Sequence, residues 1–160
     1  MVARVEELVR AHADCFVRSC YPGHLTGSAW ITSADGERAL LVHHRKLDKW
    51  LQPGGHADGQ TDIAEVALRE AQEETGLTDL QLADPTPLDV DVHLIPARGA
   101  DPEHEHHDIR FHFIAANGAT PIVSDESHAV RWFTEAELFA ATQEESVLRL
   151  WRKARLAATR

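Results

Sequence analysis

The chain has 160 residues, of which 43% are hydrophobic and 26% charged, a balance typical of a folded globular domain rather than a disordered chain. Its formal net charge of −10 argues against nucleic acid as a partner, because proteins that bind a phosphate backbone usually carry a basic footprint. No apolar run approaches the ~18–20 residues of a membrane span, and the N-terminus lacks a signal-peptide pattern. We therefore expect a cytoplasmic protein with one domain, residues 1–160, and no membrane partner.

The first 22 residues are expected to form a helical extension of that domain. Apolar residues of segment 2–20 lie roughly on one stripe with charged residues opposite, and Tyr21-Pro22-Gly23 stops the helix. The helix could pack on the domain or mediate dimerisation, so both a monomer and a homodimer stay open. Cys15 and Cys20 are expected to be reduced, partly buried packing residues.

The rest of the chain alternates between expected strands and helices. Strands are predicted at residues 27–33, 38–44, 49–52, 88–95, 108–115 and 129–133. Helices are predicted at residues 62–75, from residue 135, and at residues 144–157. Segments 88–95 and 108–115 should pair as antiparallel neighbours, and residues 98–107 between them should form an exposed loop.

The segment from Trp50 to Leu77 is the most informative part of the chain. It reads as a strand, a Pro53-Gly54-Gly55 turn and an amphipathic helix rich in carboxylates. Glu70, Glu73 and Glu74 fall at i, i+3 and i+4, on one helix face, where like charges repel unless something positive lies between them. A solvated acidic helix is the simpler alternative, but it does not explain the Pro-Gly-Gly turn.

These residues resemble the Nudix box, the loop–helix signature of the Nudix hydrolases. Gly55 begins the pattern, and Arg69-Glu70, Glu73-Glu74 and Gly76-Leu77 fall in register with it. There are two departures. Thr61 stands where the first glutamate of the pattern belongs, with Asp62 directly after it, and Ala71 fills an aliphatic position with a small side chain. The first departure concerns the loop geometry more than metal binding.

The resemblance, which covers about residues 27–140, implies an α/β fold: an α/β/α sandwich with a mixed, curved sheet, here with an extra N-terminal helix. It also implies an enzyme, a pyrophosphohydrolase that splits the pyrophosphate bond of a nucleoside diphosphate linked to another moiety, such as a nucleoside triphosphate or a nucleotide sugar. The expected partner is thus a small nucleotide substrate. Ligands that are all oxygen atoms favour Mg²⁺ or Mn²⁺ over zinc.

The resemblance assigns roles to individual residues. Glu70 and Glu74 would be the principal metal ligands, with Glu73 and the Gly54 carbonyl completing the set. Arg69 would orient the glutamates by pairing with them. An acid that precedes the Trp132-Phe133 pair matches a second family pattern, and this nominates Glu126 as general base, with Glu70 as competitor. The alternative for Glu126 is an exposed loop glutamate.

Substrate-binding residues are predicted from the resemblance for Arg45 and from strand parity for the others. Arg45 follows the second strand, where a basic residue is often found in Nudix proteins. His106, Asp108 and Arg110 share one strand parity, so they are predicted to form a polar wall that faces the substrate. Residues 103–108 also have the composition of a zinc tract, but ligands so closely spaced rarely close a tetrahedral shell. A solvated or substrate-facing loop is therefore the favoured interpretation.

The substrate itself is not identified by the sequence. The tyrosine associated with dinucleoside polyphosphates is absent downstream of the box, since the single tyrosine is Tyr21. Two alternatives to a hydrolase stay open. One is a catalytically silent Nudix module that senses a nucleotide, and the other is an enzyme like isopentenyl-diphosphate isomerase. The isomerase would need a cysteine beside the sheet, whereas both cysteines precede it.

Overall fold

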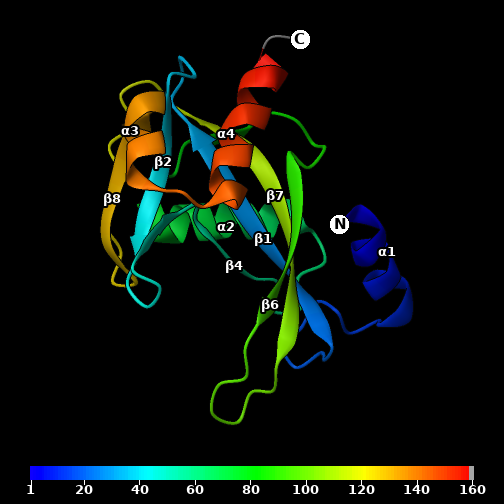
Figure 1. Ribbon diagram of the computed structural model, residues 1–160. Helices are drawn as coiled ribbons and strands as arrows, with labels where there is room; N and C mark the ends of the chain where they lie inside the picture. The colour runs from blue at the N-terminus through cyan, green and yellow to red at the C-terminus, as the bar shows by residue number, and fades with distance from the viewer. Residues whose placement is uncertain (159–160) are drawn as a thin grey trace.

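Residues 1–158 are described in a computed structural model with eight strands and four helices, in which one helix precedes four strands, a second separates these from four more, and the other two helices come last (Figure 1). The helices are α1 (Val2–Ala11), α2 (Ile63–Thr75), α3 (Glu135–Ala141) and α4 (Glu145–Ala158). The strands are β1 (Gly23–Thr32), β2 (Arg38–His44), β3 (Lys49–Leu51), β4 (Gly54–His56), β5 (Leu80–Leu82), β6 (Asp89–Ile95), β7 (His104–Ala115) and β8 (Ser127–Thr134).

The strands form one mixed sheet. Its main path runs β3-β2-β1-β7-β5, while β4 pairs with β1, β6 with β7 and β8 with β2. The long pair β1–β7 is parallel, and the other pairs are antiparallel, including the predicted β6–β7 pair. This confirms the α/β architecture with a mixed sheet.

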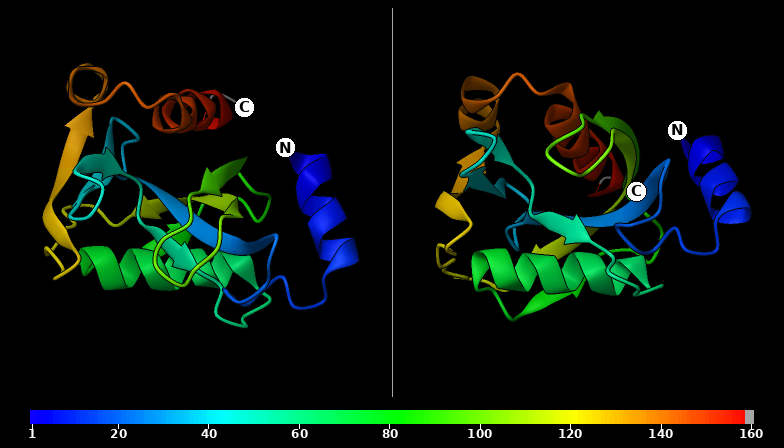
Figure 2. Two further views of the ribbon diagram at one scale, coloured as in Figure 1. Left: turned by 60° about the horizontal axis from the view of Figure 1, so that its bottom comes forward. Right: turned by 90° about the horizontal axis from the view of Figure 1, so that it is seen from below.

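Helices cover both faces of the sheet. Figure 2 shows α2 against one face and α3 with α4 against the other. Under α2, Ala67 and Ala71 pack on apolar side chains of β1, β2 and β7. Gly27 of β1 makes this approach close, because a Cβ there would lie 2.9 Å from the Ile63 carbonyl oxygen and 3.0 Å from the Ala67 nitrogen. The small residues therefore bring the carboxylate-rich helix tightly against the centre of the sheet.

The termini of α2 and α3 are capped. Asp62 accepts hydrogen bonds from the Ala64 and Glu65 backbone N–H groups, and Gly76 ends α2 in the left-handed conformation with φ 69°. Thr134 and Glu137 form a capping box at α3. Among residues 1–158, no helix is both long and apolar enough to cross a membrane.

The N-terminal helix is shorter than predicted. It ends at Ala11 instead of residue 20, and His12 is already extended with φ −131°. The reason is packing: Cys15 and Cys20 are free and buried in a small core with Leu8 and Leu25, and the chain must turn to bring them there. Figure 1 shows α1 standing to one side of the sheet, beside β6.

Strand β7 begins earlier than predicted. Residues 104–107, expected in an exposed loop, belong to the strand, because β1 also begins at Gly23 and pairs with β7 from Gly23–Glu105 onward. The backbone groups of this segment find partners on both sides, since β6 pairs with it over Asp89–Ile95. The consequence is that the histidines of this segment lie at fixed positions on the sheet.

Candidate active site

The Pro53-Gly54-Gly55 turn is held between β1 and α2. The Ala29 N–H donates to the Pro53 carbonyl (2.9 Å), and the Gly54 N–H donates to Glu74 Oε1 (2.8 Å). In an antiparallel pair, the N–H and C=O of one residue point to the same side. Gly54 pairs with Ser28 of β1, so its carbonyl points to the same side as the N–H that contacts Glu74. The Glu74 carboxylate and the Gly54 carbonyl oxygen therefore lie on the same side of the turn.

Glu74 is buried, with 7% of its surface exposed. Burial raises the pKa of its carboxyl to about 7, the Gly54 hydrogen bond opposes this, and the charges of Glu70, Glu126 and Glu73 raise it further. A buried carboxylate surrounded by other carboxylates calls for a cation. The donor set, all oxygen, fits a hard divalent ion such as Mg²⁺ or Mn²⁺.

Arg69 holds Glu70 beside the turn. Its guanidinium donates to Glu70 Oε1 (2.7 Å) and to the His56 carbonyl (2.9 Å), and its Nε lies 3.9 Å from Glu73 Oε1. Burial raises the pKa of Glu70, and Arg69 opposes that shift. Through His56, Arg69 also contacts the start of the loop that contains Thr61, the position of the pattern's first glutamate. The neighbouring Asp62 at the end of this loop caps the helix.

Gly55 is expected to be sensitive to substitution because it faces Glu70. A Cβ at Gly55 would lie 2.5 Å from the Glu70 Cδ atom, so Gly55→Ala must displace this carboxylate. We expect kcat to fall on the order of 10²-fold, as for a misplaced catalytic group. Gly118→Ala is the control, since nothing lies within 4 Å of that position and only its φ of 75° adds strain. If initial rates show equal activity of the two variants, the assignment of Glu70 to the active site is contradicted.

Glu126 and Arg45 meet at the exposed rim of this site. The Arg45 N–H donates to the Glu126 carbonyl (3.2 Å), and the Arg45 Nε donates to the Ser127 carbonyl (3.2 Å). The carboxylate of Glu126 is exposed, yet its charge raises the pKa of both Glu70 and Glu74. The loop before β8 therefore brings Glu126 within electrostatic range of the helix carboxylates, as its position before Trp132-Phe133 suggested.

Asp108 and Arg110 lie beneath the turn rather than on an open wall. Each is 3% exposed. Asp108 accepts hydrogen bonds from Thr26 (2.9 Å), Ser28 (2.8 Å) and Arg110 (2.7 Å). The Ser28 hydroxyl in turn lies directly under Gly54, where it would be 2.2 Å from an added Cβ. This buried network supports the floor of the site, while His106 lies farther along β7.

Sequence reasoning missed several members of this network. Asp89 and Asp91 of β6 pair with Arg110 (3.4 and 3.3 Å) and with Arg149 of α4 (2.8 and 2.9 Å). Their alternation with apolar residues indicates only a two-faced strand, and the matching cations lie about 20 and 60 positions away along the chain. The small residues Gly27-Ser28 in a strand were the one local signal of a close approach.

The comparisons with known proteins show the family and the fold of this chain. A family model described as NUDIX domain matches residues 24–152. No curated protein matches the chain. Among solved structures, a C. elegans Ap4A hydrolase binary complex superposes with a TM-score of 0.69 at 18% identity, covering 84% of this chain and 97% of that one. A NUDIX-family hydrolase from Clostridium perfringens gives 0.67 at 23% identity, with the same coverage of 84% and 97%. A MutT NUDIX hydrolase from Burkholderia pseudomallei gives 0.58 at 25% identity, covering 81% and 95%.

Proposed function

Because this chain belongs to the Nudix family and is a pyrophosphohydrolase, we propose that it splits the pyrophosphate bond of a nucleoside diphosphate linked to another moiety, with Mg²⁺ or Mn²⁺ as cofactor. The observation that carries the proposal is the buried Glu74 carboxylate, bonded to the Gly54 N–H and facing the charges of Glu70 and Glu126. A site this acidic repels a phosphate ester unless cations lie between them.

The residues that would hold the cations are those that the turn and α2 bring together. Glu70 and Glu74 are the principal ligands, and Glu73 with the Gly54 carbonyl completes the set. Bound divalent cations would neutralise phosphate charge, acidify the attacking water and orient an in-line displacement. Arg69 keeps the Glu70 carboxylate beside Gly55 through its 2.7 Å hydrogen bond.

Glu126 is proposed as the general base. Its exposed carboxylate can be reached by water and can take a proton on a carboxylate oxygen, and its loop places it near Glu70 and Glu74. Glu70 is the competitor, but its Oε1 already accepts the 2.7 Å hydrogen bond from Arg69 and its carboxylate is proposed as a metal ligand, so it is less free to take a proton from water. Glu126→Gln should therefore lower kcat relative to wild type more strongly at low pH than at high pH. At high pH, hydroxide from the solvent can attack without a general base.

The substrate is proposed to be a nucleoside triphosphate or a nucleotide sugar. Within residues 1–158, Arg45 donates hydrogen bonds from its backbone N–H and its Nε, so its terminal guanidinium nitrogens can meet a phosphate at the rim. Direct substrate contact by His106, Asp108 and Arg110 stays a prediction, and the burial of Asp108 and Arg110 supports the view that they act from beneath. The isomerase alternative gains no support, because Cys15 and Cys20 are buried beside α1.

A substrate panel tests the proposal. It contains nucleoside triphosphates, nucleotide sugars, ADP-ribose and dinucleoside polyphosphates, each assayed for phosphate or nucleotide release with Mg²⁺, with Mn²⁺ and with a chelator. Metal-dependent turnover of one class would support the proposal and name the substrate. No turnover of any member, together with a thermal shift on nucleotide binding, would instead favour the sensing module.

A further inference from the structure

Three histidines from separate parts of the chain converge on one point of the sheet. His24 of β1, His56 of β4 and His106 of β7 each offer one ligand atom, and these atoms all lie within 4.8 Å of one another. Their ring centroids are 4.9–5.2 Å apart. The sheet register produces the cluster, because His24 pairs directly with His106, and His56 pairs with Thr26, which lies on the same face of β1 as His24.

This cluster is distinct from the glutamate site. Gly55 faces Glu70 of α2, as the 2.5 Å approach of an added Cβ shows. Side chains alternate along a strand, so His56 points away from α2, as do His24 and His106 by their register. The two sites thus lie back to back across β4, with carboxylates on one side and imidazoles on the other.

His24 has a nitrogen that calls for a ligand. The ring is 1% exposed, and its Nδ1 lies 3.4 Å from the Cys20 carbonyl, which can only accept a hydrogen bond. Nε2 then carries the lone pair, and it is buried without a hydrogen-bond partner among residues 1–158. An unpartnered buried polar atom is costly, and a metal–nitrogen bond would satisfy it.

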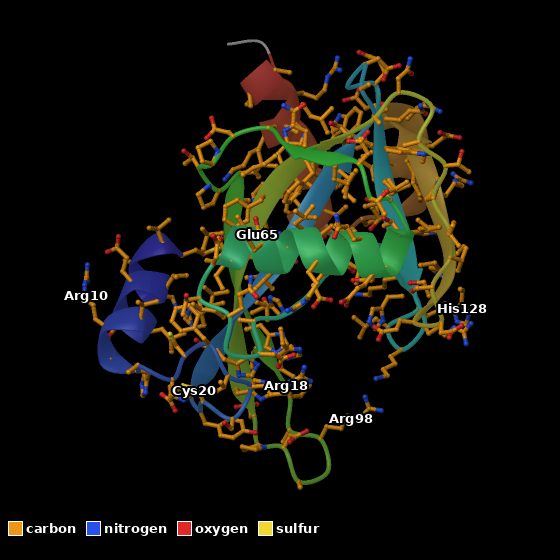
Figure 3. All side chains as sticks on the ribbon, turned by 180° about the vertical axis from the view of Figure 1, so that it is seen from behind. Arg10, Arg18, Cys20, Glu65, Arg98 and His128 are labelled. Atoms are coloured by element: carbon orange, nitrogen blue, oxygen red, sulfur yellow. The ribbon has the colours of Figure 1, made fainter. Side chains whose placement is uncertain are left out.

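The surroundings are compatible with a cation. Imidazole binds metal in its neutral form. The nearby positive charge of Arg18 is balanced by Asp58, to which it donates two hydrogen bonds of 2.8 and 2.7 Å. Figure 3 shows Arg18 and Cys20 at this end of the sheet and His128 at the opposite edge.

We propose that His24, His56 and His106 form a second metal site that binds Zn²⁺. Three imidazoles are a ligand set suited to zinc, whereas oxygen ligands select magnesium. His104, whose ring stacks on His24 with centroids 4.9 Å apart, is a neighbouring side chain that could supply the fourth ligand. The ion would tie β4 to β1 and β7, and so fix the strand that begins with Gly54 and Gly55. The site does not depend on the proposed function, and within it His106 would bind the ion instead of the substrate.

Zinc titration of the chelator-treated full chain tests this site. We expect wild type to bind one Zn²⁺ per chain, measured by competition with a chromophoric chelator, and to show a zinc-dependent rise in Tm. His106→Gln and His56→Gln should each weaken binding on the order of 100-fold or more, because losing a ligand exceeds the loss of an outer-shell partner. Co²⁺ should give wild type the visible absorption of a nitrogen-ligated tetrahedral site.

Two control variants make the test specific. His128→Gln changes an exposed histidine at the opposite edge and should bind zinc as wild type does. Glu74→Gln should also retain the zinc, because it alters only the carboxylate side of β4. Zinc binding that persists in both cluster variants, or that is lost in Glu74→Gln, would overturn the proposal. If one cluster variant fails to fold by circular dichroism, the other and the wild-type Co²⁺ spectrum decide.

Discussion

Replacing Glu74 by glutamine is expected to lower kcat on the order of 10³-fold or more, which corresponds to about 4 kcal/mol of lost transition-state stabilisation. The carboxylate is proposed as a principal ligand, and a neutral amide removes its charge while keeping its shape. The glutamine carbonyl can still accept the 2.8 Å hydrogen bond from Gly54. The fold should therefore persist, and the loss should fall on catalysis.

Glu65→Gln is the matched control for this variant. Glu65 lies on the same helix, but it is exposed in the first turn, and Figure 3 labels it there. It should keep activity within about twofold of wild type, as expected for a surface change. Both variants would be compared by initial rates at saturating Mg²⁺ and by thermal unfolding. A loss below tenfold in Glu74→Gln would remove Glu74 from the principal ligands.

The loop–helix part of the site could be predicted because its signals are local. The capping residue Asp62, the C-terminal Gly76 and the i, i+3, i+4 spacing of the glutamates all lie within one continuous segment. Helix geometry then determines which side chains share a face. That Arg69 pairs with the glutamates is implied by the resemblance to the Nudix box, and Arg69 does donate to Glu70 Oε1.

The buried network and the histidine cluster could not be predicted because they depend on strand register. Whether His24 meets His106 or another residue is decided by the parallel pairing of β1 with β7, which joins residues about 80 positions apart. Each histidine alone resembles an ordinary polar position of a strand. Of the tract 103–108, His106 belongs to the cluster of three among the described residues, and its partners come from two other strands.

Replacing Arg110 by methionine is expected to lower the free energy of unfolding by about 3–5 kcal/mol, as for a buried ion pair that loses one partner. Arg110 is 3% exposed and contacts Asp108, Asp89 and Asp91, so its loss leaves three carboxylates buried with fewer cations. Arg10→Met is the control. Its guanidinium pairs with Glu6 at the surface and points away from the sheet (Figure 3), so the change should be within about 0.5 kcal/mol.

The pH dependence of this effect has a defined sign. The pKa of Asp91 is lowered by its hydrogen bond with His93, by a hydrogen bond from Arg149 and by the charge of Arg110, although burial opposes this shift. For Asp89, burial is the largest single effect and raises the pKa, but hydrogen bonds and charges of Arg149 and Lys153 lower it overall. Folded wild type thus binds fewer protons than the unfolded chain near their unfolded pKa of about 3.9, and its stability falls as pH drops through that range. In Arg110→Met the carboxylates of Asp89 and Asp91 lose a neighbouring cation, so their pKa in the folded state rises. Protonating them then destabilises the folded variant less than it destabilises the folded wild type. The difference in free energy of unfolding between wild type and Arg110→Met, measured by urea unfolding, should therefore narrow from pH 7 to pH 4. A difference that stays constant or widens would show that the destabilisation comes from packing rather than charge.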